Sequence, residues 1–253
     1  ERRVDYCFQP IVSAHDGHVV AYEALMRPQL PTLRSPITVM QLASEMGRLY
    51  DIEKLTFFRA CECYEELEAA GKLDADALIF VNSIASVSLS DEDWASYCEA
   101  HSAILPKLVV EITEEEEMNE RELERKRNVP GATGVFALDD YGSGYSNGNS
   151  LLTVAPKYVK VDIAIIRGID TDADKQQFLR ALINYVHPRG VQVLAEGVET
   201  LSELRKVLEM GVDLLQGYCL APPAAEPGAI GEKAAEVIAE VERRKAEREE
   251  AGS

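Results

Sequence analysis

Basic residues are scarce in this sequence of 253 amino acids. It has 26 Lys and Arg residues against 44 Asp and Glu residues, and its formal net charge at pH 7 is −18. A surface this acidic repels the phosphate backbone of DNA or RNA, so we exclude long nucleic acid as a partner. A small anionic ligand remains compatible with the charge if metal ions mediate the contact.

Long apolar runs are also missing. No run approaches the roughly 18 residues expected of a membrane span, and no signal peptide is visible, so we expect no membrane contact from this chain itself. The sequence begins with Glu1 rather than Met. We therefore expect a domain of a longer protein, which other domains could tether to a membrane.

Cysteine is infrequent, and no Cys-x-x-Cys pair occurs. The odd number of cysteines favours reduced thiols in a cytosolic protein over a disulfide framework. The five cysteines are Cys7, Cys61, Cys63, Cys98 and Cys219.

No Gly/Ser-rich or Pro-rich linker divides the chain, and short apolar runs alternate with helical patterns instead. The first two runs are joined by a turn that contains Asp16-Gly17, a pair typical of β-hairpins, so we expect these two strands to be antiparallel. The predicted strands are Tyr6–Val12, Val19–Leu25, Leu78–Asn82, Leu108–Ile112, Gly134–Asp139, Tyr158–Asp162, Val191–Ala195 and Asp213–Tyr218.

Helical patterns separate the later strands. Residues 51–70 form one, an apolar stripe within 178–186 indicates a second, and residues 201–210 form a third that ends at Gly211, a helix-stop signal. Strands that are apolar throughout and alternate with helices indicate a buried parallel sheet. Six or seven such units predict a (β/α) barrel. An open doubly wound sheet is the alternative, although no G-x-G-x-x-G motif supports its dinucleotide-binding form.

Nearly every predicted strand ends in a polar group that can bind metal or phosphate. In a parallel barrel these ends open on one face, where active sites lie. Several buried carboxylates would repel one another there unless a divalent cation neutralised them. Oxygen ligands without His or Cys suit Mg²⁺ or Mn²⁺ better than zinc. These strand-end residues are Glu23, Asn82, Glu111, Asp139, Asp140, Lys160, Asp162, Glu196 and Gln216.

Single acidic residues at strand ends are often helix N-caps, and that interpretation fits Glu111, Asp139 or Asp140 taken alone. It does not explain the whole series. Adjacent carboxylates at 139 and 140 can bridge two metal ions, and the glycines of the following Tyr141-Gly142-Ser143-Gly144 let the chain turn close to a ligand. Two bridged metals clamp a phosphodiester, so these residues predict a metal-dependent phosphodiesterase.

Eight short motifs occur in an order that resembles the EAL-domain family of cyclic di-GMP phosphodiesterases. They extend from about residue 4 to residue 222. The motifs begin at Phe8 (FQPIV), Tyr22 (YEALMRP), Phe80 (FVNS), Val110 (VEITE), Asp139 (DDYGSG), Val159 (VKVD), Ala195 (AEGVE) and Gln216 (QGY).

This resemblance implies a TIM-like (β/α)8 barrel with an antiparallel first strand. It also implies hydrolysis of cyclic di-GMP to linear pGpG with two Mg²⁺ or Mn²⁺ ions, a cytoplasmic bacterial location and a homodimer. Residues 1–253 would then be a single EAL-type domain with its core at about 4–222, followed by a C-terminal helix and charged tail at 228–253. We expect the tail, Arg243–Ser253, to be solvated and frayed.

The resemblance further implies a role for each site residue. Glu23, Asn82, Glu111 and Asp139 would hold one metal, and Asp139 would bridge to the second beside Asp140 and Glu196. Lys160 would orient or activate the attacking water, and Glu196 is a candidate general base. Arg27 would hold a substrate phosphate, and Gln9 and Gln216 would lie along the substrate.

Glu114 resembles the acid that stabilises the loop after Asp140, although it could instead be a first-turn helix acid favoured by the helix dipole. Departures from the family pattern are few. Tyr141 stands for the commoner Phe and Ser143 for the commoner Thr, and the stretch Asn147–Ser150 is more polar than in many members. None of these changes removes a metal ligand. A non-catalytic cyclic di-GMP receptor is the alternative function, and ligand hardness also predicts that Ca²⁺ binds the same site and inhibits.

Overall fold

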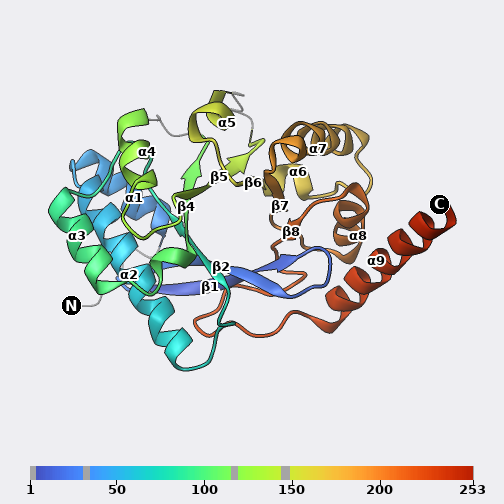
Figure 1. Ribbon diagram of the computed structural model, residues 1–253, viewed down its shortest axis with the longest axis horizontal. Coiled ribbons are helices and arrows are strands. Elements are labelled where there is room, and N and C mark those ends of the chain that lie inside the picture. Colours follow the sequence, from blue (N-terminus) through green and yellow to red (C-terminus); the bar gives the residue numbers. More distant parts are fainter. Residues whose placement is uncertain (1–3, 31–34, 115–118, 144–148, 253) are drawn as a thin grey trace.

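The structure, a computed structural model, describes residues 4–30, 35–114, 119–143 and 149–252. Eight strands close into a barrel in sequence order, as predicted, so the open-sheet alternative is wrong (Figure 1). The strands are apolar because both of their faces are buried. Helices cover the outside of the barrel, and side chains of the other strands fill the inside. The strands are β1 Val4–Ser13, β2 Val19–Pro28, β3 Leu78–Asn82, β4 Leu108–Thr113, β5 Val135–Tyr141, β6 Tyr158–Val161, β7 Gln192–Ala195 and β8 Leu214–Leu215.

The strand directions agree with the hairpin prediction. β1 pairs antiparallel with β2 and with β8, whereas every pair from β2–β3 to β7–β8 is parallel. The carboxyl ends of seven strands therefore share one face of the barrel. β1 runs the other way, and the register places Gln9 of β1 opposite Glu23 of β2 at this face.

Helices surround the barrel, with α1–α4 on one side and α6–α8 on the other (Figure 1). None of the described helices is long and apolar enough to cross a membrane. The α-helices are α1 Pro36–Glu45, α2 Leu49–Ala69, α3 Asp91–Ala100, α4 Glu120–Arg127, α5 Asn149–Val154, α6 Ile163–Ile166, α7 Ala173–Val186, α8 Leu201–Met210 and α9 Glu232–Gly252; 3-10 turns span Leu105–Lys107 and His187–Arg189.

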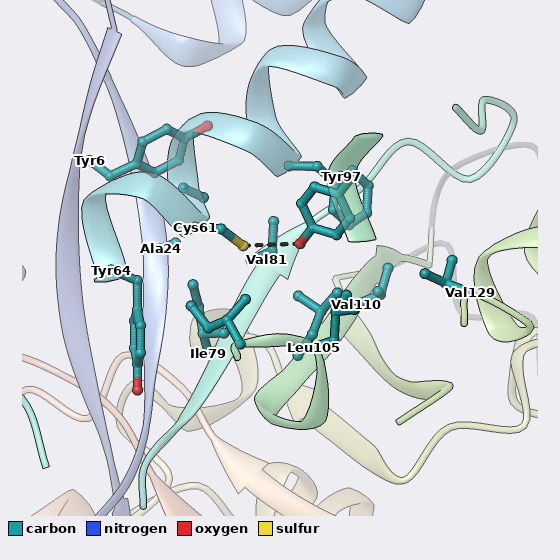
Figure 2. Close-up of a cluster of buried hydrophobic side chains, with 14 of the residues drawn as sticks. Tyr6, Ala24, Cys61, Tyr64, Ile79, Val81, Tyr97, Leu105, Val110 and Val129 are labelled. Carbon is teal, nitrogen blue, oxygen red and sulfur yellow. Dashed lines mark hydrogen bonds between the residues drawn. The ribbon is translucent and has the colours of Figure 1, made fainter. Parts of the chain in front are cut away.

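The core has an inner and an outer layer. Inside the barrel, inward-facing apolar side chains such as Ile11, Phe80 and Leu194 pack together and fill the lumen. Between strands and helices, aromatic residues dominate on the α2–α3 side. Figure 2 shows part of this layer, where Tyr97 lies beside Cys61 with 3.0 Å between Oη and Sγ. All five cysteines are free thiols.

Two predictions about element ends were wrong. The last strand was expected over residues 213–218 but contains only Leu214–Leu215, because the chain turns at Gly217 to bring Gln216 to the barrel mouth. The charged tail was expected to fray, but α9 continues to Gly252. Its first half is anchored because Val237, Ile238 and other apolar residues of one face are buried against the rest of the core.

Candidate metal and substrate site

The strand-end carboxylates converge around one lysine at the mouth of the barrel. Lys160 on β6 is almost completely buried, and its Nζ lies 2.5 Å from an oxygen of Glu111 on β4 and 2.9 Å from an oxygen of Asp139 on β5. The same Nζ lies 2.9 Å from Glu196, which follows β7, and 3.6 Å from Glu23 on β2. Closure of the barrel therefore brings together residues that are up to 173 positions apart, from 23 to 196.

The carboxylates form two groups that share one member. Oxygen atoms of Glu23, Glu111 and Asp139 lie within 4.8 Å of one another, and so do oxygen atoms of Asp139, Asp140 and Glu196. This spacing suits two neighbouring divalent cations bridged by the shared aspartate. Asn82 adjoins the first group, since its Nδ2 lies 3.4 Å from Glu23 Oε1.

Burial and mutual repulsion dominate the electrostatics of the ring. Burial, followed by the negative charge of Glu23, raises the pKa of Glu111 well above its usual range although Lys160 opposes the shift. Burial likewise raises the pKa of Glu196 well above its usual range. Burial alone would lower the pKa of Lys160, but the surrounding carboxylates, Asp139 first, more than offset this and hold it well above the usual value. The surrounding carboxylates therefore favour the charged form of the lysine.

The carboxylate oxygens of the ring could bind a divalent cation in addition to the ammonium group of Lys160. Four carboxylates contact one ammonium group, so the ring retains excess negative charge. Glu111 Oε2 is buried and has no hydrogen-bond partner among the residues that the structure describes. A buried carboxylate oxygen normally has a partner, so this oxygen is available to act as a metal ligand. Both carboxylate groups offer only oxygen atoms, the donors that Mg²⁺ and Mn²⁺ prefer.

The end of β5 and the turn after it have a strained and close-packed backbone. Asp140 has a φ of +55°, unusual for a residue other than glycine, and such strain often marks functional sites. Gly142 has a φ of +97°, and a Cβ there would lie 3.0 Å from Ile165. The second glycine of this motif, Gly144, and residues Asn147 and Gly148 lie outside the described residues.

Glu114 makes hydrogen bonds on both sides of the segment that follows β5. Its Oε1 accepts a hydrogen bond from the Ser150 hydroxyl at 3.0 Å, and its Oε2 accepts one from the Gly142 amide at 3.5 Å. Its own amide donates to the Asp139 carbonyl at 3.1 Å. Glu114 thus connects both ends of the loop after β5. The alternative of a first-turn helix acid does not apply to α4, which begins at Glu120 behind an Asn119 cap.

The two predicted glutamines form a hydrogen-bonded row beside the ring. Gln216 Nε2 donates to Glu23 Oε2 at 2.7 Å and to Gln9 Oε1 at 3.3 Å. Both glutamines line a cavity of about 280 Å³ together with Glu23 and Glu196. The motif glycine between Gln216 and Tyr218 is required sterically, because a Cβ at Gly217 would lie 2.2 Å from the Val198 carbonyl oxygen.

Arg27 lies in a second cavity, of about 560 Å³, which it lines with Asn82, Ile37 and Met40. Its Nη1 donates to the Met26 carbonyl at 3.0 Å. Leu25 lines both cavities, so they adjoin. Arg27 makes no described ion pair with the carboxylate ring but shares its cavity with Asn82, which adjoins the ring.

Three lining residues carry no site role in the sequence prediction. Tyr218, 68% exposed, and Glu199 line the cavity beside the ring, and Glu53 lines the cavity beside Arg27. Tyr218 and Glu199 stand inside motifs that were recognised, so their position next to Gln216 and Glu196 was the available signal. Glu53 lies within helix α2 and has no comparable signal.

Fold and site together define an α/β-barrel protein with a buried, oxygen-rich cluster of carboxylates at the carboxyl ends of its strands, which could hold divalent cations. Comparison with known proteins agrees with that class. The EAL domain family model matches residues 1–223, and the chain belongs to this family. The residues beyond this match include helix α9.

Two of the curated relatives are named as cyclic di-GMP phosphodiesterases. The chain is 26% identical over 223 residues to the probable cyclic di-GMP phosphodiesterase PdeG of Escherichia coli, covering 85% of this chain and 44% of that protein. It is 30% identical over 226 residues to the cyclic di-GMP phosphodiesterase NbdA of Pseudomonas aeruginosa, covering 85% of this chain and 28% of that protein. The chain thus spans less than half the length of either relative.

Among solved structures, the chain is similar to Klebsiella pneumoniae BlrP1 in complex with manganese and cyclic di-GMP. The TM-score is 0.76 at 26% sequence identity, covering 90% of this chain and 58% of the other. A calcium and cyclic di-GMP complex of the same protein matches with a TM-score of 0.75, at the same identity and coverage.

Proposed function

We propose that this chain is a metal-dependent phosphodiesterase domain that hydrolyses cyclic di-GMP to linear pGpG. One observation carries the proposal: two groups of carboxylates share Asp139 at the mouth of the barrel. The names of the relatives support the substrate, and the residues of the site support the reaction.

Two Mg²⁺ or Mn²⁺ ions would be held by the ring. One ion would be held by Glu23, Asn82, Glu111 and Asp139. The second would be held by Asp139, Asp140 and Glu196. Bound there, the ions would supply the positive charge that a phosphodiester needs during hydrolysis and would lower the pKa of water.

The chain's own groups would orient the reactants. The Glu196 side chain is 16% exposed and borders the cavity beside the ring, so its carboxylate can accept a proton from a water molecule there. Lys160 would hold that carboxylate through its 2.9 Å ion pair and would orient the water. Gln9 and Gln216 would contact the substrate along the same cavity.

The adjoining cavities suit an elongated, two-base ligand. Arg27 is the basic side chain in the larger one and would bind a phosphate, because a guanidinium pairs well with phosphate oxygens. The apolar side chains of Ile37 and Met40 offer a surface for one nucleobase. Tyr218 at the rim of the smaller cavity offers a ring on which another base can stack.

The whole protein's assembly is part of the same proposal. We propose one EAL-type domain with core residues 4–222, belonging to a longer protein and acting as a homodimer. The exposed apolar side chains of Leu152 on α5 and Tyr185 on α7 line one cavity and support the homodimer, because a second copy of the chain could bury them. Analytical ultracentrifugation of wild type and Leu152→Glu tests it. The wild type sediments as a dimer and the variant as a monomer; a monomeric wild type contradicts it.

Turnover of cyclic di-GMP tests the proposed activity. Product is followed by chromatography for wild type and Glu23→Ala, with Mg²⁺ and with chelator. The wild type makes pGpG only with the metal, and Glu23→Ala is slower by more than about 100-fold, because even partners outside the ligand shell cost about 10–100-fold. Metal-loaded wild type that binds cyclic di-GMP without cleaving it would exclude the enzyme and favour a receptor.

A further inference from the structure

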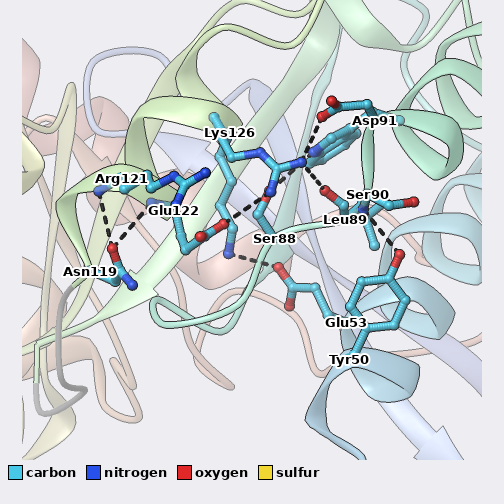
Figure 3. A network of polar contacts seen from close by, with 12 residues as sticks. Tyr50, Glu53, Ser88, Leu89, Ser90, Asp91, Asn119, Arg121, Glu122 and Lys126 are labelled. Atoms are coloured by element: carbon cyan, nitrogen blue, oxygen red, sulfur yellow. Dashed lines mark hydrogen bonds and ion pairs between the residues drawn. The ribbon is translucent and has the colours of Figure 1, made fainter.

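A second buried ion pair lies outside the carboxylate ring. Glu53 on α2 and Lys126 on α4 are 2.7 Å apart from carboxylate oxygen to Nζ, and their side chains are 1% and 0% exposed. Figure 3 shows Lys126 reaching from its helix to Glu53. Neither residue was singled out by the sequence, and neither belongs to the ring described above.

This pair surrounds the peptide that follows Asn82. The Ser83 hydroxyl donates to Glu53 Oε1 at 2.6 Å, and the Ile84 amide donates to Glu53 Oε2 at 2.9 Å. Lys126 Nζ donates to the Ser83 hydroxyl and to the Ile84 carbonyl, both at 2.6 Å. The backbone donor and acceptor of Ile84 are therefore both held by the pair, and Ser83 is held from two sides.

The same segment is connected to another member of the ring. The Ser83 amide donates to the Glu111 carbonyl at 3.0 Å, and Asn82 lies opposite Glu111 in the β3–β4 register. Lys126 itself comes from α4, the described helix that follows β4. The pair thus links the carboxyl ends of β3 and β4 just where Asn82 and Glu111 enter the site.

Holding two helices together does not require buried charges. Removing an acid and an amine from water is costly, and apolar side chains of similar size often stabilise a fold as well or better. An ion pair differs from an apolar contact because its hydrogen bonds fix the direction of the groups it touches. Here those groups are Ser83 and Ile84, the two residues directly after Asn82.

We propose that Glu53 and Lys126 are positioning residues that hold Asn82 in the orientation needed to bind a divalent cation. The inference rests on the proposed function, in which Asn82 is a metal ligand. The pair acts through the backbone of residues 83 and 84 and is not itself a metal ligand, although Glu53 also lines the cavity beside Arg27. Loss of the pair weakens metal binding more than it slows the reaction at saturating metal.

The test is Mn²⁺ binding, read from the electron paramagnetic resonance signal of free Mn²⁺, together with cleavage of cyclic di-GMP across the same Mn²⁺ range. In Glu53→Gln and Lys126→Met the half-saturating Mn²⁺ concentration rises about 10–100-fold, as expected when partners outside the ligand shell are lost, while kcat at saturation stays within about threefold. Ser83→Ala removes one hydroxyl from the network and leaves the buried pair, so it folds; its half-saturating concentration rises about threefold or more.

Glu65→Gln is the matched control. It makes the same change on the same helix, where Glu65 pairs with His101 at 2.9 Å, but it lies near the end of α2 and has no contact with residues 82–84. It keeps wild-type Mn²⁺ affinity even if its melting temperature falls. Wild-type half-saturation in Ser83→Ala and in the folded variants of the pair would overturn the inference. A wild type that neither binds Mn²⁺ nor cleaves cyclic di-GMP would instead defeat the proposed function beneath it.

Discussion

Lys160 is the residue on which the charge balance of the ring depends when no metal is bound. Its ammonium contacts Glu111, Asp139 and Glu196 within 2.9 Å, and its side chain is 1% exposed. Among the described ion pairs, Lys160 is the only cationic partner of Glu23, Glu111, Asp139 and Glu196. The lysine therefore stabilises the metal-free site, and bound cations would share that role.

Lys160→Met tests this role. Removing one partner of a buried ion pair leaves uncompensated charge, so we expect the free energy of unfolding to fall by about 3–5 kcal/mol in chelator. Saturating Mn²⁺ narrows the difference, because the added cations neutralise the same carboxylates. Thermal unfolding with chelator and with Mn²⁺ measures both effects. Lys157→Met, which removes an exposed lysine that bonds the Gly190 carbonyl, is the control. Equal stability of Lys160→Met and wild type in chelator would contradict the role.

The members of the ring could be predicted from the sequence because each follows a run of apolar residues that forms a strand. In a closed parallel barrel that position alone decides that Glu23, Glu111 and Asp139 meet. The buried pair of Glu53 and Lys126 could not be predicted. Both residues are in helices, where charged side chains are usually exposed, and only their convergence on residues 83–84 buries them.

At the scale of elements, helix α8 shows how a short signal fixes the position of a loop. Thr200 and Glu203 form a capping box, with the Glu203 amide donating to the Thr200 hydroxyl at 3.2 Å and the Thr200 amide donating to Glu203 Oε2 at 2.9 Å. Glu203 also accepts hydrogen bonds from the amides of Glu199 and Gly168. One carboxylate thus connects the start of α8 with the segment that carries Glu196 and with the end of α6.

Glu203 predicts a pH dependence of stability. Burial alone would raise the pKa of Glu203, but the amides of Gly168, Thr200 and Glu199 donate to the carboxylate and lower it below the ordinary value. A carboxyl with a lowered folded-state pKa stabilises the fold above its unfolded-state pKa of about 4.3 and loses that contribution as the pH falls through the folded-state value.

Glu203→Gln should therefore lower the free energy of unfolding by about 1–3 kcal/mol at neutral pH, since hydrogen bonds to a charged acceptor are lost. The difference from wild type should shrink as the pH falls below about 4. Urea unfolding from neutral pH to below pH 4 measures this difference in free energy of unfolding. Glu209→Gln is the control, because Glu209 is an exposed residue of the same helix. A difference that stays constant down to acidic pH would show that the ionised carboxylate is not responsible.

Element ends were predicted less well than elements. Gly211 was predicted to end α8 because glycine is a helix-stop signal, and the structure confirms this with a left-handed backbone at Gly211, φ +88°. The strand at β8 was predicted but made too long, because residues 216–218 belong to a loop whose course depends on the close approach of Gly217 to Val198. The helical tail was missed because a run of charged residues was interpreted as solvated and unstructured. In the structure such residues form ion pairs along α9, as Arg243 and Glu247 do.

At the scale of the whole molecule, barrel closure and strong net negative charge act together. The net charge of −18 attracts divalent cations in general, while the ring concentrates acidic groups at one place. Because all donors are hard oxygen atoms, the site does not exclude Ca²⁺, which accepts longer bonds and more ligands than Mg²⁺.

We therefore expect Ca²⁺ to compete with Mg²⁺ and to inhibit turnover of cyclic di-GMP. Its looser coordination would hold the substrate without the geometry that hydrolysis requires. Initial rates at fixed Mg²⁺ with increasing Ca²⁺ measure the inhibition, and excess Mg²⁺ should relieve it. Inhibition that excess Mg²⁺ leaves unchanged would place the Ca²⁺ outside the ring.

The most direct test of the two-cation ring is the number of Mn²⁺ ions bound per chain, measured at saturation by equilibrium dialysis with elemental analysis. We predict two ions for the wild type and fewer than two for Asp140→Asn, because Asp140 belongs only to the second carboxylate group. A wild-type chain that binds no Mn²⁺, or a second ion that is unaffected by Asp140→Asn, would contradict the account.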